Sequence, residues 1–223
     1  TFCSTKLVKG KLFSYPMDAI REEVKEHLKA GCKEIWITSN DNGAYMVEQG
    51  GKQRLVELLE QVLSVPMDFK LRLGMMNPGN TLTTLHELIE VYKHPKMFKF
   101  LHIPLQSGNN EILKLMNRRY SVEEFIKVVE GFRKEIPEIT ISTDLIVGFP
   151  SETLQQFQDT LEVIKKIKPD MTNISRYASR EGTISAKMVQ LSSNRLKQRS
   201  TLATSLCHDI YLENNKKWMD WEG

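Results

Sequence analysis

The chain has 223 residues, of which 40% are hydrophobic and 26% are charged, and its net charge is +3. This composition is typical of a soluble globular protein with one sizeable core. No apolar run approaches the roughly 20 residues that span a bilayer, and no charged-then-apolar leader opens the chain, so we expect no membrane segment. The small net charge neither requires nor excludes a polyanionic partner.

The three cysteines are Cys3, Cys32 and Cys207. They are widely separated and odd in number, which argues against a disulfide framework and favours a reducing compartment. We therefore expect an intracellular, cytoplasmic protein, in which Cys32 and Cys207 are small buried apolar groups.

Hydrophobic periodicity predicts helices alternating with strands. In chain order, the pattern predicts a helix at 16–30, a strand at 33–39, a helix at 55–63, a strand at 68–74, a helix at 82–92, a strand within 97–108, helices at 109–117 and 121–135, a strand within 139–153, a helix at 153–167, a strand at 170–178 and a helix at 194–218. Ser14 is the candidate cap of the first helix, ahead of Pro16. Five strands alternating with helices predict right-handed crossovers and a parallel sheet, in a single α/β layer or barrel.

Polar loops follow the predicted strands, at residues 38–45, 74–80, 102–110, 148–153 and 177–183. They are rich in Asn, Ser, Gly, Gln and Thr, as expected of the ligand-binding edge of a parallel sheet. Gly148 would let a ligand approach the backbone, or would only make a tight turn. No phosphate loop, nucleophile motif or carboxylate pair is present, so an external cofactor is the natural source of chemistry.

Five stretches of the sequence occur in one order, namely RLGMMNP, FLHIPLQSG, LMNRRY, TDLIVGFPSET and REGT. Together they resemble radical S-adenosylmethionine (SAM) methylthiotransferases, especially the archaeal and eukaryotic type that acts on threonylcarbamoyladenosine in tRNA. The resemblance runs through nearly the whole chain. It implies an α/β fold, a partial (β/α)6 TIM-like barrel with parallel strands whose first strand is missing or truncated.

The opening TFCSTKLVKGK is similar to the surroundings of the third cysteine of the family's C-x3-C-x2-C motif, which holds a [4Fe-4S] cluster. The resemblance thus makes Cys3 a metal ligand and places the two other cysteines upstream of Thr1. It further implies that residues 1–223 are a radical SAM core domain, without the family's N-terminal cluster domain and C-terminal RNA-binding β-barrel. We expect such a fragment to be inactive alone and to hold no cluster stably, because a lone thiolate cannot hold one.

The implied function is a transferase that methylthiolates C2 of N6-threonylcarbamoyladenosine at position 37 of tRNA. The implied cofactors are SAM and two [4Fe-4S] clusters in the full-length protein, and the implied partners are the tRNA anticodon loop and a low-potential electron donor. Alternatives are the same chemistry on isopentenyladenosine in tRNA or on a ribosomal protein, and a non-catalytic RNA-binding barrel.

The resemblance assigns no catalytic side chain. By motif position, it assigns the cofactor pocket to Ser39, Asn40, Asp41, Gln106, Ser107, Asp144, Gly148, Tyr177 and Arg180. The family has Glu-Asp-Thr or Gln-Asp-Thr where this chain has Asn-Asp-Asn, so only Asp41 matches cleanly in that loop.

Other candidate residues concern the core and RNA. Arg72 would point into the barrel, or would form a buried salt bridge with a carboxylate such as Asp144. Tyr45 and Arg180 are candidate platforms for a flipped base. Candidate phosphate contacts are the basic groups Lys6, Lys9 and Lys11, Arg118 and Arg119 with Tyr120, and Arg195, Lys197 and Arg199.

Overall fold

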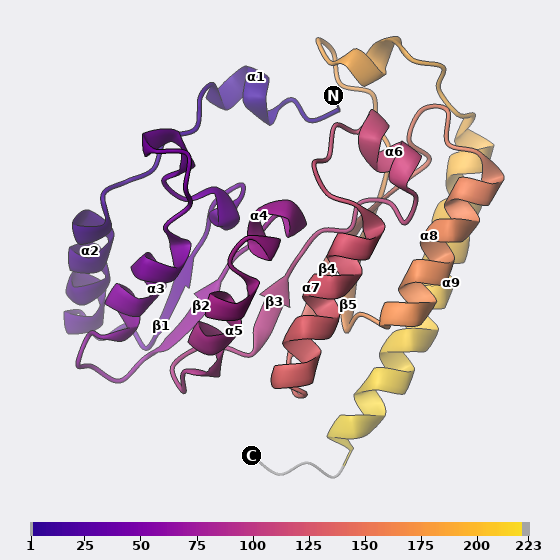
Figure 1. The fold of residues 1–223 in the computed structure, drawn as a ribbon. Helices are drawn as coiled ribbons and strands as arrows, with labels where there is room; N and C mark the ends of the chain where they lie inside the picture. Colours follow the sequence, from indigo (N-terminus) through magenta and orange to yellow (C-terminus); the bar gives the residue numbers. More distant parts are fainter. Residues whose placement is uncertain (1, 220–223) are drawn as a thin grey trace. The chain divides into compact units, whose positions relative to one another are not determined.

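The computed structural model describes residues 2–219, except the side chain of Lys6 (Figure 1). In chain order its elements are α1 Thr5–Lys9, α2 Met17–Lys29, β1 Glu34–Ile37, η1 Asn42–Ala44, η2 Val47–Gln49, α3 Leu55–Leu63, β2 Lys70–Leu73, α4 Pro78–Leu82, α5 Leu85–Lys93, β3 Phe100–His102, α6 Asn110–Leu115, α7 Val122–Glu135, β4 Thr140–Val147, α8 Leu154–Ile167, β5 Met171–Arg176, η3 Ile184–Lys187, α9 Ser193–Asn215 and η4 Lys216–Trp218. The predicted helices and five strands are confirmed. The elements α1 and α4 and the 3-10 helices were not predicted, because none exceeds five residues and such short pieces show no readable periodicity.

The described chain divides into two compact units. One unit contains residues 2–10, 104–126 and 140–219, and the other contains residues 11–103 and 127–139. The assignment of residues 1–223 to one radical SAM core domain stays a prediction, and it includes Thr1 and residues 220–223, which lie outside the described residues.

In the unit with residues 11–103, β1 and β2 are parallel neighbours, with Glu34 opposite Lys70 and Ile37 opposite Leu73. Leucine and valine recur every three or four residues in α3, which gives this helix the apolar face that it buries. Tyr92 of α5 packs edge-on against Phe132 of α7, with ring centroids 5.0 Å apart. These side chains form part of the buried core of this unit.

Arg72 lies in β2 between two aromatic rings of the same unit. Its guanidinium carbon is 4.3 Å from the ring centroid of Trp36 and 4.1 Å from that of Phe100. Arg72 is half-buried, and Trp36 is 57% exposed. A carboxylate partner was one of the two alternatives for this arginine, and the partners found here are two rings, which attract a cation through their negative faces.

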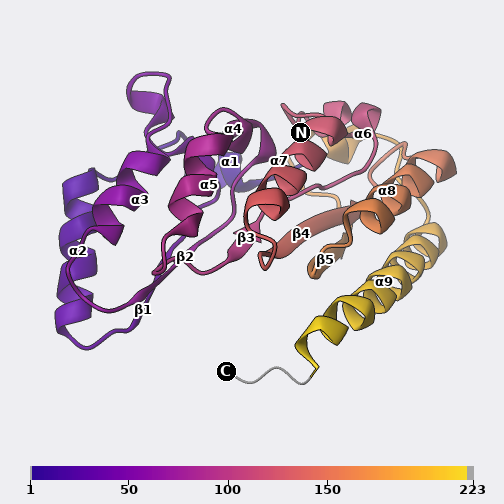
Figure 2. The same cartoon turned by 60° about the horizontal axis from the view of Figure 1, so that its bottom comes forward.

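In the other unit, β4 and β5 are parallel, with Ser142 opposite Met171 and Val147 opposite Arg176. Both pairings therefore agree with the predicted α/β fold of parallel strands. The helices α8 and α9 lie side by side and pack against these strands (Figures 1 and 2). Thr153 begins α8 with a capping box that includes Gln156.

Ser14 does not cap α2, contrary to the prediction. The N-cap of α2 is Pro16, without a side-chain hydrogen bond. The Ser14 hydroxyl instead donates to a carboxylate oxygen of Glu48 at 3.2 Å and accepts from the backbone N–H of Met46 at 2.9 Å. Ser14 thus ties the segment before α2 to the loop after β1.

Two further expectations have different outcomes. Cys207 is buried in α9, as predicted, whereas Cys32 is exposed in the turn after α2, so its predicted burial is wrong. Within residues 2–219, no helix has both the length and the apolar character needed to cross a membrane.

Candidate functional site

A cavity of about 390 Å³ lies beside the N-terminal segment, in the unit that contains β4 and β5. Its wall consists of residues 2–5, residues 175–178 at the end of β5, Ile146 and Arg180. Ligands of parallel α/β proteins bind at the carboxyl ends of strands, where this cavity lies. Three predicted site residues, Cys3, Tyr177 and Arg180, therefore meet at a position suited to a ligand.

Cys3 stands two residues before α1, with its thiol exposed. Its Sγ is 3.0 Å from Oγ1 of Thr5 and 3.4 Å from the backbone nitrogen of Thr5. Partial burial acts to raise the pKa of the thiol, but the Thr5 hydrogen bonds and the charge of Arg118 outweigh it, so the pKa is lowered from its ordinary value. A lowered pKa favours the thiolate, the form that binds iron.

Cys3 therefore fits as one ligand of an iron–sulfur cluster. Within residues 2–219, no group of three His, Cys, Asp or Glu side chains could hold a metal ion. The described residues supply one cysteine sulfur to this cavity, and the remaining ligands of a cluster would have to come from elsewhere.

Phe2 anchors Cys3 to the core. Its ring packs edge-on against Phe149, with centroids 6.1 Å apart, and the guanidinium carbon of Arg118 lies 5.3 Å from the Phe2 ring centroid. Nε of Arg118 is buried and has no hydrogen-bond partner among the described residues. Arg118 was a candidate phosphate contact as part of a basic group with Arg119, and its proximity to Phe2 and Cys3 was not predicted.

Gln106 combines two costly features. Its φ is +65°, which is rare for a residue other than glycine, while its backbone N–H donates to the carbonyl of Asp144 at 2.7 Å and its carbonyl accepts from Ile146 at 3.0 Å. Its Oε1 is buried without a hydrogen-bond partner among the described residues, and the residue is 7% exposed. Each feature costs about 1–3 kcal/mol, and such costs concentrate at functional sites. The cofactor role of Gln106 stays a prediction, with these features in its favour.

Ser107 is fully occupied with structural contacts. Its Oγ is 3.4 Å from Oγ1 of Thr160 in α8 and accepts from the backbone N–H of Asn109 at 3.3 Å. The next residue, Gly108, donates its backbone N–H to the same Thr160 oxygen at 2.9 Å. These contacts fasten the loop to α8, and the cofactor role of Ser107 stays a prediction.

Gly148 is approached by a helix. Its φ is +74°, and a Cβ at this position would lie 2.0 Å from Cδ2 of Leu196 in α9. Its backbone N–H donates to a carboxylate oxygen of Glu152 at 3.0 Å. The tight turn and the packing of α9 therefore explain this glycine, and its predicted contact with a ligand stays a prediction.

Asp144, Tyr177 and Arg180 differ in their surroundings. A carboxylate oxygen of Asp144 accepts from Nδ2 of Asn173 on β5 at 3.0 Å. Tyr177 is 8% exposed, and its hydroxyl donates to Oγ of Ser185 at 2.9 Å. Arg180 is exposed at the cavity, which leaves its guanidinium available to an anion.

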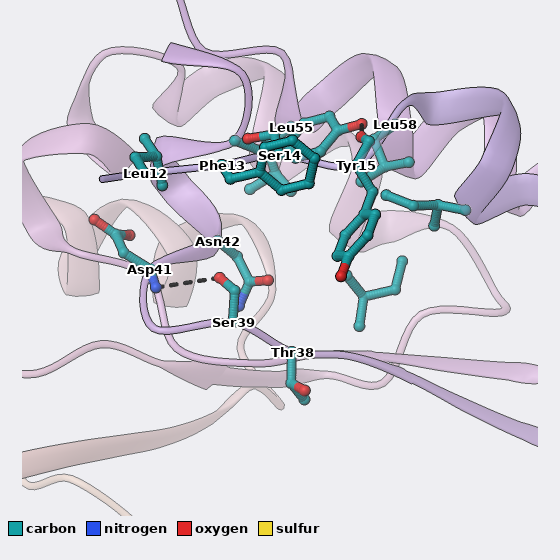
Figure 3. Close-up of a pocket in the computed structure, with 13 residues that line it drawn as sticks. Leu12, Phe13, Ser14, Tyr15, Thr38, Ser39, Asp41, Asn42, Leu55 and Leu58 are labelled. Carbon is teal, nitrogen blue, oxygen red and sulfur yellow. Dashed lines mark hydrogen bonds between the residues drawn. The ribbon is translucent and has the colours of Figure 1, made fainter. Parts of the chain in front are cut away.

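The three other predicted site residues, Ser39, Asn40 and Asp41, follow β1 in the second unit (Figure 3). Ser39 and Asp41 line a cavity of about 180 Å³ that is closed by residues 12–15 and by leucines of α3. Oγ of Ser39 accepts from the backbone N–H of Asp41 at 3.1 Å. Asn40 is exposed and is not part of this cavity wall.

Asp41 joins two loops. Its Oδ1 accepts from the backbone N–H groups of Gly43 at 3.0 Å and Asn77 at 2.9 Å, and its Oδ2 accepts from Nδ2 of Asn80 at 2.8 Å. The carboxylate thereby holds the loop after β1 against the beginning of α4. This structural role was not predicted, and the cofactor role of Asp41 stays a prediction.

Tyr45, a predicted base platform, lines the same 180 Å³ cavity. Its hydroxyl donates to the backbone carbonyl of Tyr15 at 2.7 Å, and partial burial raises its pKa. Tyr45 therefore holds the segment before α2 in place.

A buried ion pair between Glu152 and Arg199 was missed by sequence reasoning. Nη1 of Arg199 donates to the backbone carbonyl of Glu152 at 3.0 Å and also to its carboxylate. The side chain of Arg199 is 8% exposed and that of Glu152 is 1% exposed. Burial raises the pKa of Glu152, against the opposing charge of Arg199. The assignment of Arg199 to an RNA-binding patch is therefore wrong. Its spacing from the buried Ala203 and Cys207 was the available signal, because residues four apart share a helix face.

Comparison with known proteins identifies the family. The family model of the Radical SAM superfamily matches residues 1–164, which is more than half of the chain. Such proteins use SAM and a [4Fe-4S] cluster, for which Cys3 fits as a ligand.

Two relatives cover nearly the whole chain. The "Probable threonylcarbamoyladenosine tRNA methylthiotransferase" of Pyrococcus horikoshii is 45% identical over 219 residues, which are 98% of this chain and 51% of the relative. The "Threonylcarbamoyladenosine tRNA methylthiotransferase" of Homo sapiens is 40% identical over 209 residues, 93% of this chain and 36% of the relative. The chain thus spans about half the length of the archaeal relatives it matches.

Solved structures share the fold. Coproporphyrinogen III oxidase from Escherichia coli, described as a radical SAM enzyme, matches with a TM-score of 0.64 at 18% identity, over 87% of this chain and 45% of that chain. Methylornithine synthase matches with a TM-score of 0.59 at 15% identity, over 94% of this chain and 64% of that chain. This likeness concerns the fold and agrees with the α/β architecture expected from the sequence. The matched family model and the fold together lead to one conclusion: the chain belongs to the radical SAM superfamily.

Proposed function

We propose that this chain is the radical SAM core of a tRNA methylthiotransferase, which adds a methylthio group to C2 of N6-threonylcarbamoyladenosine at position 37. The observation that carries the proposal is identity of 40–45% over more than 90% of the chain with proteins of Pyrococcus horikoshii, Drosophila melanogaster and Homo sapiens that share this name. Isopentenyladenosine in tRNA and a ribosomal protein are less favoured as substrates, because relatives from both archaea and animals carry the threonylcarbamoyladenosine name. A non-catalytic barrel is less favoured because Cys3 retains the features of a cluster ligand.

The residues at the 390 Å³ cavity have chemistry suited to this function. Cys3 would hold one iron of a [4Fe-4S] cluster, which together with SAM supplies one-electron chemistry at unreactive carbon. Arg180 offers a positive charge to a carboxylate or phosphate. Gln106 is not among the described residues that line this cavity, and the role we propose for its buried Oε1 is to accept a hydrogen bond from an N–H or O–H of the cofactor. Tyr177, which lines the cavity, packs edge-on against the buried Phe149, with centroids 5.5 Å apart.

The proposal extends to partners and location. The region of the tRNA that binds would be the anticodon loop. A low-potential electron donor would reduce the [4Fe-4S] cluster, and a second [4Fe-4S] cluster would carry the sulfur of the methylthio group. A cytoplasmic location accords with a tRNA substrate and with three cysteines that form no disulfide among the described residues.

Nucleoside analysis tests the proposal. The intact protein, reconstituted anaerobically with iron and sulfide, is incubated with SAM and with tRNA that contains unmethylthiolated threonylcarbamoyladenosine. We expect about eight irons per chain and a new methylthio nucleoside detected by mass spectrometry. Cys3→Ser should abolish the product, and Cys32→Ser, which changes another exposed thiol, should retain it. A product on isopentenyladenosine alone, or equal activity of Cys3→Ser, would contradict the proposal.

A further inference from the structure

A second hollow lies in the unit with β4 and β5, between the end of β5 and α9, and has a volume of about 540 Å³. The strand and the helix are neighbours in both views (Figures 1 and 2). The side chains that line it are polar or basic, namely Arg176, Ser200, Thr201, Thr204, Ser205 and His208. We call this hollow the α9 groove.

The helix geometry of α9 explains why these side chains face the solvent. The opposite face carries Arg199, Ala203, Cys207 and Ile210, which are buried at spacings of three and four residues. Because each residue turns the helix by about 100°, the residue that follows each buried one lies outside the buried face. The lining residues Thr201, Thr204, Ser205 and His208 are exposed. On the α9 side, the groove is therefore lined by hydroxyl groups and an imidazole, and these side chains are not part of the apolar core.

The charges at the α9 groove favour an anion. None of its six described lining residues is acidic, and Arg176 contributes a guanidinium. Hydroxyl and guanidinium groups are the common donors to phosphate oxygens of nucleic acids. An apolar partner segment would find no apolar side chain among those six residues.

Arg176 links the α9 groove to the candidate site. It lines the 390 Å³ cavity that contains Cys3 and Arg180, and it also lines the α9 groove. A polymer that places one unit in the cavity would have its neighbouring units within reach of Arg176. The next units would then lie along the hydroxyl row of α9.

We propose that the α9 groove binds the sugar–phosphate backbone of the RNA substrate next to the nucleotide that enters the cavity. Arg176 pairs with a phosphate at the junction, and the hydroxyls of Thr201 and Ser205 donate to the following phosphates. This inference rests on the proposed function, because it takes tRNA as the substrate.

Binding of tRNA to the intact protein tests the proposal, measured by fluorescence anisotropy over a series of salt concentrations. The variant Thr201→Glu with Ser205→Glu places two carboxylates in the α9 groove and should weaken binding by at least about tenfold. Glutamate is a good helix former, so α9 should keep its structure, which circular dichroism checks. Arg176→Gln should reduce the slope of log K against log[salt] by about 0.7–0.9. Lys134→Gln, which removes an exposed charge of α7 that belongs neither to the groove nor to a predicted phosphate-contact group, is the control and should change the affinity less.

The outcomes separate this inference from the proposed function. SAM cleavage without RNA should be unchanged in the Thr201→Glu, Ser205→Glu variant, which excludes damage to the cavity. If this variant binds tRNA like wild type while wild type methylthiolates it, the α9 groove proposal is overturned and the function stands. If wild-type protein binds no tRNA, both are overturned. If polyglutamate, added at the same concentration of negative charge as the tRNA, displaces the tRNA from the protein, RNA is overturned as the ligand of the groove.

Discussion

Replacing Gly108 by alanine should destabilise the unit with β4 and β5 by about 2–5 kcal/mol. A Cβ at this position would lie 2.5 Å from Cα of Thr160 and 3.0 Å from the carbonyl oxygen of Asp159. Both are backbone atoms of α8 and cannot rotate away, so the loop must retreat by about 1 Å to reach an ordinary contact distance. The retreat would stretch the hydrogen bonds from Gly108 and Ser107 to Thr160, now 2.9 and 3.4 Å long. Each bond contributes about 1 kcal/mol and the strain about 1–3 kcal/mol.

Urea unfolding of the Gly108→Ala protein without cofactor, followed by circular dichroism, measures this loss. Gly131→Ala is the matched control, because a Cβ there would meet Cδ2 of Leu85 at 3.3 Å, the end of a flexible side chain. Alanine is also favoured over glycine in the interior of a helix such as α7 by about 1 kcal/mol, so the control should stay within about 1 kcal/mol of wild type. An unfolding midpoint of Gly108→Ala equal to that of wild type would refute the reasoning.

Three further substitutions test the contacts at the site. Asp41→Asn should lower the stability of the cofactor-free protein by about 1–3 kcal/mol, because an amide cannot accept all three hydrogen bonds. An unchanged melting temperature would show that the carboxylate is not structural. Arg118→Met should raise the pKa of the Cys3 thiol, because the positive charge of Arg118 lowers it. Alkylation of Cys3 by iodoacetamide, followed by mass spectrometry, should then require a higher pH. Arg118→Lys keeps the charge and should leave the pH profile nearer to that of wild type. Glu152→Gln should lower the free energy of unfolding in urea by about 3–5 kcal/mol, because it leaves the Arg199 charge buried without its partner. The double variant with Arg199→Met should regain part of that stability. Strictly additive losses would exclude energetic coupling of the two side chains.

The elements of the fold were predictable because each has a long apolar pattern. The leucines of α3 and the apolar run of β4 both point to buried faces, and they lie where the sequence placed them. The short helices α1 and α4 were not predictable, since tertiary contacts and caps such as that of Asn77 on Gly79 stabilise them.

The candidate site was predictable only by motif. The motifs single out particular loops, but they do not specify what each side chain contacts. Ser107 and Gly148 occur in loops predicted to bind a ligand, and in the structure Thr160 and Leu196 are the groups that approach them. The approach of one helix to a loop depends on residues about 50 positions away in the chain, which no local pattern encodes.

The helix α9 shows why a charge run is a weak guide to a binding surface. Arg195 and Arg199 are four residues apart and share a face of the helix, whereas a step of 100° per residue turns Lys197 to the other side, and of the three only Arg199 is buried. Arg199 enters the core and holds Glu152, whose carboxylate accepts from the backbone of Gly148, while the hydroxyls next to Arg199 along the chain line the α9 groove. One helix therefore fastens the loop after β4 with its buried face and presents donors with its exposed face. If the α9 groove binds RNA as proposed, a substitution on the buried face should change stability and RNA binding together, whereas one among the groove residues should change RNA binding alone.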